Sequence, residues 1–152
     1  MRLKSFSAFA LVLYALALLT GCASYPTQEL SDARQAIRAA EEVGANKQFP
    51  EIFNKASDLL TKAESELNDA SPKFSDAKSK AIAAKQEAVK ARHLTVAIQD
   101  AEKTIAKLEN EDSKLSEAKQ ALSKAMKAIE QDNFEEAMKF SELAKNLAIQ
   151  GR

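Results

Sequence analysis

Small and apolar residues recur at alternating spacings of three and four along almost the whole chain after residue 26. Leu30, Ala33, Ile37 and Ala40 begin this pattern. Because an α-helix turns once in 3.6 residues, the spacing places these side chains on one face of a helix. A strand would need strict alternation over runs of β-branched and aromatic residues, and the sequence contains no such run. The chain is therefore predicted to be all-α.

Caps and breakers divide the pattern into about five helices. The first is predicted to begin at an N-cap Thr27 and to end near Val43, before a left-handed Gly44. The second begins near Pro50, because proline is favoured in the first helical turn. Pro72 ends it.

The third predicted helix is much longer than the others. No Gly or Pro occurs from Lys73 to Glu109, so we expect one helix whose apolar stripe shifts near His93. Glu109 to Ser113 is a predicted turn, and residues 115–129 form the fourth helix. Asn133, which has capping-box spacing to the Glu three residues later, starts a fifth helix that runs to the end.

A shared unit of about 20 residues underlies these helices. Its starting residues are Leu30, Phe53, Phe74, Leu94, Leu115 and Phe134. A fixed period predicts stacked helices, and a single helix of about 15 residues is marginal in water. Alanine lets helices approach closely, while each Phe, Leu or Ile contributes about 1.5–3 kcal/mol when fully buried. We expect an antiparallel helical bundle or helical-hairpin array with little room for an interior ligand.

Residues 1–21 have the composition of a secretory signal. A basic start containing Arg2 and Lys4 precedes an apolar run that is too short to cross about 30 Å of hydrocarbon. The run closes with Leu19-Thr20-Gly21-Cys22, which resembles the lipobox of bacterial lipoprotein precursors. The resemblance implies that residues 1–21 are removed as a signal helix and that lipid is attached covalently to Cys22. A disulfide within the chain is excluded, because Cys22 is the sole cysteine.

The expected domain organisation follows from this cleavage. Residues 22–26 form a lipidated anchor and linker, and residues 27–152 form a single α-helical periplasmic domain. Two or more acyl chains hold a protein stably at a membrane. Ala23 follows the cysteine, and in lipoproteins of enteric-type Gram-negative bacteria this resembles the default for sorting to the outer membrane. We expect a lipid-anchored outer-membrane protein that faces the periplasm.

Charge argues against a nucleic-acid partner and points to one local feature. The chain has 22 basic and 22 acidic side chains, and loss of Arg2 and Lys4 leaves a formal −2. Six basic residues gather on the long helix: Lys73, Lys78, Lys80, Lys85, Lys90 and Arg92. Hereafter the basic stripe, they are candidates for contact with anionic lipid headgroups, lipopolysaccharide or acidic wall polymers. Alternatively they form a solvated face or pair with the acidic stretch from Asp100 to Glu117.

No constellation of residues predicts catalysis, a cofactor or a metal site. Zinc needs several His or Cys ligands, and after cleavage the chain offers only His93 and Cys22. A nucleophile would have to use His93 as its base, without a Gly-rich loop or oxyanion hole nearby. His93 is interpreted either as a pH-sensitive contact or as a half-exposed helix residue.

The pattern Pro26-Thr27-x-Glu29-Leu30-x-x-Ala33-Arg34-x-Ala36-Ile37-x-x-Ala40 follows the lipobox directly. Gly44-Ala45 and Phe53-x-x-Ala56-x-x-x-Leu60-x-x-Ala63 come next. This stretch, roughly Cys22 to Leu94, resembles a domain-of-unknown-function family of Gram-negative envelope lipoproteins whose members often precede an OmpA-like domain. The resemblance implies an envelope location and a helical fold, and it assigns no catalytic residue. The chain ends after its helices and lacks the strand-rich OmpA-like part, so that part's wall-binding activity is not carried over.

These features predict a non-enzymatic structural or protein-interaction module with an envelope protein as partner. The alternative is a binder of peptidoglycan or lipopolysaccharide through the basic stripe.

Overall fold

The computed structural model describes residues 24–108 and 113–151. Over these ranges the chain forms helices and no strand: α2 (Thr27–Glu42), α3 (Ala45–Gln48), α4 (Pro50–Leu67), α5 (Phe74–Ile105), α6 (Ser113–Glu130) and α7 (Phe134–Gln150). The predicted all-α class and its five long helices are confirmed there. The predicted signal helix, the lipobox and Cys22 lie outside the described residues, as does most of the turn predicted at Glu109–Ser113.

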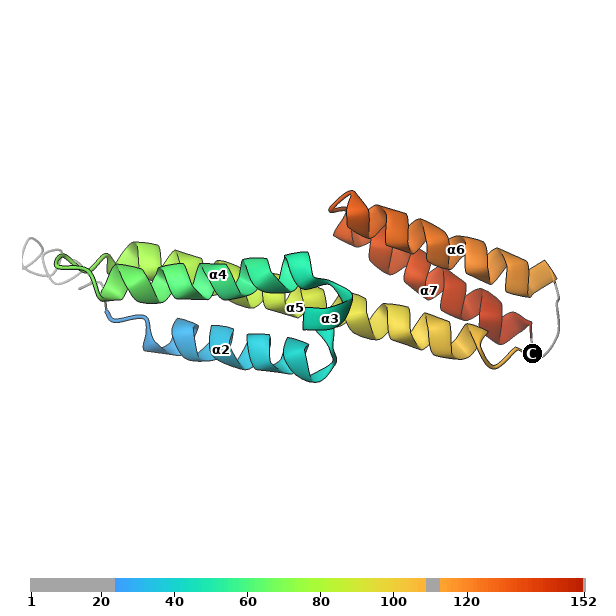
Figure 1. The fold of residues 1–152 in the computed structure, drawn as a ribbon, viewed down its shortest axis with the longest axis horizontal. Helices are drawn as coiled ribbons and strands as arrows, with labels where there is room; N and C mark the ends of the chain where they lie inside the picture. The colour runs from blue at the N-terminus through green and yellow to red at the C-terminus, as the bar shows by residue number, and fades with distance from the viewer. Residues whose placement is uncertain (1–23, 109–112, 152) are drawn as a thin grey trace, which may run out of the picture.

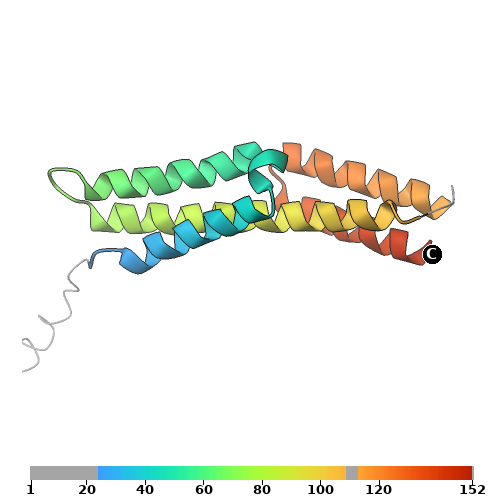
Figure 2. The same ribbon diagram turned by 60° about the horizontal axis from the view of Figure 1, so that its bottom comes forward.

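Helix α5 is the central element of an elongated molecule (Figure 1). Its first half packs against α2 and α4, and its second half packs against α6 and α7. The α2–α4 hairpin and the α6–α7 hairpin therefore lie one after the other along α5, as Figure 2 also shows. At 1.5 Å per residue, the 32 residues of α5 span about 48 Å. The predicted hairpin array is thus two three-helix bundles that share one helix.

Local sequence signals place several helix ends correctly. Gly44 has φ of +84°, a left-handed conformation that glycine adopts without steric cost. Pro50 is the first residue of α4, where its missing N–H costs nothing. The side chain of Asn133 accepts a hydrogen bond from the backbone N–H of Glu136 at 3.2 Å. The predictions made for Gly44, Pro50 and Asn133 are thus confirmed.

Two boundary predictions are wrong, and one short helix was not predicted. Thr27 is the first residue of α2 and not its N-cap, because Pro26 precedes the helix. The short helix α3 was not expected; the Lys47 and Gln48 amides both bond the Gly44 carbonyl, so one turn forms directly after the glycine. Helix α5 ends at Ile105, short of Glu109, because its last bonds tighten from i→i+4 to i→i+3.

Alanine forms the contact seam between the helices, as the spacing predicts. The seam residues are fully buried: Ala33, Ala40, Ala56, Ala63, Ala77, Ala81, Ala84, Ala88, Ala91, Ala101, Ala118, Ala125, Ala137 and Ala144. Of the large residues, Leu30 and Leu94 are buried, whereas Phe53, Phe74 and Phe134 are only partly buried. Close contact through alanine leaves no space for a ring between helix axes, so the aromatic rings cover the seam from its edges.

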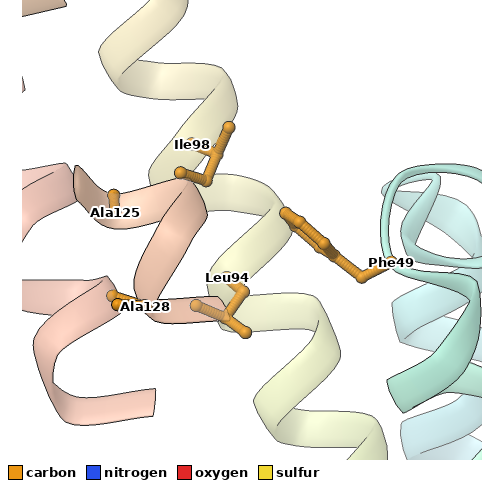
Figure 3. Packing of buried hydrophobic residues seen from close by; sticks show 6 residues of the cluster. Phe49, Leu94, Ile98, Ala125 and Ala128 are labelled. Atoms are coloured by element: carbon orange, nitrogen blue, oxygen red, sulfur yellow. The ribbon is translucent and has the colours of Figure 1, made fainter. Parts of the chain in front are cut away.

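One cluster joins the two bundles, and we call it the joint cluster. It consists of Phe49, Leu94, Ile98, Ala125, Ala128 and Ala137, all buried. Phe49 projects from the α3–α4 connection onto α5, and the α6 alanines pack on the same stretch of α5 (Figure 3). Because Phe49 belongs to the first bundle and the α6 alanines to the second, this cluster links both halves beyond the continuity of α5.

Candidate functional site

The basic stripe on α5 is engaged in ion pairs with neighbouring elements. The pairs are Lys78–Glu29 at 2.9 Å, Lys80–Glu66 at 2.8 Å, Lys85–Asp32 at 2.8 Å, Lys90–Asp132 at 2.8 Å and Lys73–Glu66 at 3.8 Å. Their partners lie on α2, on α4 and in the α6–α7 turn, and not in the Asp100–Glu117 stretch. Arg92, the sixth member, is exposed and pairs with no residue in the described ranges.

These contacts bias the carboxylates towards their charged form. The hydrogen bond from Lys78 holds the pKa of Glu29 below its ordinary value, and the bond from Lys85 does the same for the pKa of Asp32. Lys80 lowers the pKa of Glu66 in the same way. At neutral pH the stripe therefore clamps α2 and α4 onto α5 through opposite charges. Most positive charges of the basic stripe are therefore already paired and less available to an external anion.

Two open grooves follow the outer face of α5 and meet at His93. The α5–α7 groove has a volume of about 590 Å³ and includes Arg92, Val96 and Lys145 in its lining. The α2–α5 groove, about 500 Å³, is lined by Ile82 and Val89 among others. His93 is exposed and lines both. The grooves offer an apolar floor with charged edges.

Two of the polar groups that line the α5–α7 groove beside His93 are engaged in other contacts. The Ser141 hydroxyl donates to the Ala137 carbonyl at 2.7 Å. Asp100 accepts a hydrogen bond from Lys145 at 2.9 Å, which lowers the pKa of Asp100. Within the described ranges, no group of three His, Cys, Asp or Glu side chains is arranged to hold a metal ion. What the two grooves present is exposed apolar side chains beside charged ones.

A third concavity lies where the two bundles meet, and we call it the waist pocket. It has a volume of about 290 Å³ and lies between the α3–α4 connection and α6. Phe49, Met126 and Ile129 contribute apolar surface, and Met126 is 40% exposed. Glu51 and Glu130 stand at its edge, and neither pairs with a lysine or arginine of the described part of the chain. The waist pocket therefore combines apolar side chains with uncompensated negative charge.

Two structurally important residues escaped the sequence analysis. Phe49 is part of the joint cluster. The sequence feature that could have indicated its burial is an aromatic residue directly before a proline in a polar stretch. Gln99 donates from its side-chain amide to the Val43 carbonyl at 3.1 Å and to Gln48 Oε1 at 3.2 Å. Gln99 carried no signal, because the bonds depend on how α2 and α3 fold back onto α5.

Cys22 and the lipobox residues Leu19, Thr20 and Gly21 lie outside the described residues. Of the helices in the ranges 24–108 and 113–151, none is long and apolar enough to cross a membrane.

The fold defines an all-helical class of protein, with two hairpins packed on one shared helix. The family model for a domain of unknown function, DUF4398, matches residues 28–114, more than half of the chain. The chain therefore belongs to the DUF4398 family, which confirms its resemblance to a domain-of-unknown-function family. The match covers α2 to α5 and the first residues of α6, so it extends further than the expected limit at Leu94. No curated protein and no solved structure shows a significant match.

Proposed function

We propose that this chain is a lipid-anchored, non-catalytic module of the bacterial cell envelope that binds another envelope protein. The lipobox Leu19-Thr20-Gly21-Cys22, after a basic start and a short apolar run, supports lipid attachment at Cys22. Ala23, which follows Cys22, supports a location at the outer membrane of a Gram-negative cell, with the helical domain in the periplasm.

The observation that carries the interaction role is the position of the open surfaces along α5. The first described residues lie at one end of the molecule (Figure 1). The joint cluster, beside the waist pocket, begins at Leu94, about 30 Å along α5 from its start. Alanine fills the contact seam of both bundles, so ligands are expected at the surface. A short lipid tether at that end would leave the waist pocket and the α5–α7 groove farther from the bilayer, where a protein partner can reach them.

The alternative is a binder of peptidoglycan or lipopolysaccharide through the basic stripe. It has less support, since five of the six basic residues already contact carboxylates of the same chain. Binding of a polymer would have to compete with those pairs. Retention of the protein on purified sacculi at low salt, and its loss in an Arg92→Ala variant, would favour this alternative.

Fractionation tests the anchor. Wild-type protein grown with an alkyne fatty acid should be labelled and should sediment with outer membranes. A Cys22→Ser variant should be unlabelled and should leave that fraction. A Ser24→Cys change in the Cys22→Ser background moves the thiol by two residues and is the matched control, because labelling should not return. Unlabelled wild-type protein would contradict the proposal.

Site-specific crosslinking tests the interaction surface. A photoreactive amino acid at Met126, in the waist pocket, should give a discrete adduct in cells. The same probe at Val96 reports on the α5–α7 groove, and Gln120, which is exposed on α6 outside both concavities, is the control. Identical adduct patterns at Met126, Val96 and Gln120, or none at all, would contradict a specific protein partner.

A further inference from the structure

We propose that the end of the molecule nearest Cys22 rests directly on the lipid surface through Tyr25 and Phe74, so that the anchor also orients the rod. This inference rests on the proposed lipid attachment. Tyr25 is 56% exposed, the highest exposure among the large hydrophobic residues of the described chain. Its ring lies 6.0 Å from the ring of Phe74, at an interplanar angle of 58°. Two aromatic rings are thus paired at the tip, outside the core clusters.

Chain length limits how far Tyr25 can lie from the membrane. Tyr25 is three steps along the chain from Cys22, with two residues between them, and a fully extended chain covers at most about 3.6 Å per step. The Cα atom of Tyr25 therefore lies within about 11 Å of the Cα atom of Cys22. The headgroup layer on each side of the hydrocarbon is about 5–8 Å thick. Tyr25 is thus held at or just above the headgroups in every orientation of the rod.

The connection from Tyr25 to the first helix is rigid. Pro26 is fully buried, and the Thr27 N–H donates to the Tyr25 carbonyl at 2.8 Å. The Leu30 N–H donates to the Pro26 carbonyl at 3.1 Å, which joins this segment to α2. Phe74 opens α5 at the same end of the molecule (Figures 1 and 2). Contact of the two rings with lipid would therefore set the direction of both helices.

The side chains at this tip suit contact with a membrane through aromatic rings more than through charge. Tyrosine is enriched at the headgroup level because its ring is apolar and its hydroxyl is polar. Lys73 is exposed and only loosely paired to Glu66, at 3.8 Å. The exposed carboxylates of Asp69 and Asp76 offset its charge. The contact should therefore depend on the rings and should form on neutral lipid.

The sequence has no tryptophan and one cysteine, so a single introduced tryptophan can be followed by fluorescence and the chain can be coupled at one defined site. The mature chain, residues 22–152, is coupled through Cys22 to a maleimide lipid in phosphatidylcholine vesicles. Tyr25→Trp should show blue-shifted emission and at least twofold quenching by lipids brominated in their acyl chains. The control, Ile149→Trp, places the reporter at a similarly exposed position (50%) on α7 at the far end, and it should show neither effect. Equal quenching at both positions, or none at Tyr25→Trp, would overturn the inference.

A second pair of variants tests whether Tyr25 holds the tip in place. Phe74→Trp should also be quenched, and adding Tyr25→Ser should reduce that quenching by at least half. No reduction would show that the short tether alone brings the tip to lipid. Because the coupling is chemical, these results do not depend on acylation in the host. Failure of the fatty-acid labelling described above would remove the proposed anchor and leave the vesicle result standing, so the two failures are distinguishable.

Discussion

The two bundles that share α5 are held together by different interactions. In the first bundle, ion pairs cross every helix boundary. They are Arg34–Glu64 between α2 and α4, Lys55–Glu87 and Lys80–Glu66 between α4 and α5, and Lys78–Glu29 and Lys85–Asp32 between α2 and α5. In the second bundle, Leu94, Ile98 and Ile105 of α5 supply branched side chains to the core. Lys145–Asp100 is the ion pair between α5 and α7 found among the described residues.

The difference shows two ways of specifying how helices align. An alanine seam buries little apolar area per contact and has a nearly uniform surface, so it defines register weakly. Opposite charges on adjacent helices favour one register over others and add specificity, even where exposed pairs contribute little stability. Branched side chains that interlock define register by shape. The first bundle should therefore respond to pH as well as to side-chain volume, and the second mainly to changes in side-chain volume.

The largest effect is expected from Leu94→Ala. Leu94 is 1% exposed and lies in the joint cluster, so its truncation should lower the free energy of unfolding by about 2–5 kcal/mol. Urea denaturation followed by circular dichroism measures the change. Val96→Ala, at a position 39% exposed on the same helix, is the control and should stay within about 0.5 kcal/mol of wild type. Equal effects of the two variants would mean that burial of Leu94 in the joint cluster does not stabilise the fold.

Enlarging the alanine seam should have the next largest effect. Ala84 is fully buried on α5 within the first bundle, and Ala84→Leu forces the helices apart at a cost of about 1–3 kcal/mol. Ala106→Leu, at an exposed position just after α5, is the matched control. Hydrogen exchange should show lost protection in α2 and α4, with α6 and α7 retained. Uniform loss across all helices would show that the bundles unfold as one unit.

Removal of the Asn133 cap tests the second bundle alone. The side chain satisfies the Glu136 N–H at the start of α7, and Asn133→Ala should cost about 1 kcal/mol. Asn133→Ser keeps a capping oxygen and should recover most of that loss. Thermal denaturation measures both variants, and indistinguishable midpoints would show that the cap adds nothing here.

The smallest effect is expected from acidification of the first bundle. Glu29 and Asp32 have depressed pKa values when folded, so their pairs with lysine stabilise above the ordinary carboxyl pKa of about 4. That contribution is lost as pH falls through the folded pKa values. Glu29→Gln combined with Asp32→Asn should therefore lower the melting temperature at pH 7, and the difference from wild type should shrink towards pH 2.

Glu142→Gln is the control for acidification, because Glu142 is exposed on α7 and pairs with no described lysine or arginine. Its melting temperature should follow wild type at both pH values. A constant gap between the double variant and wild type from pH 7 to pH 2 would show that charge is not what the two carboxylates contribute.

Much of the fold was predictable because helix formation is local. A residue three or four positions along the chain shares a helix face, so the period identified most of the buried alanines. It missed four that are also buried in the core clusters: Ala45, Ala121, Ala128 and Ala148. Gly44, Pro50 and Asn133 mark helix ends through backbone geometry that depends only on their own type. The candidate site was less predictable. The basic stripe was identified, but its partners were not, since Lys85 meets a carboxylate 53 residues earlier.

The sequence by itself determined where helices form, which faces are apolar and that alanine forms the contacts, because each depends on residues within one or two turns. Tertiary structure alone decided that α5 serves two bundles, that Phe49 closes the joint between them and that most of the basic stripe binds carboxylates of its own chain. These features depend on which helices pack together and at which positions along α5. That choice is made by the summed packing and charge of faces far apart in sequence, which no short-range period encodes.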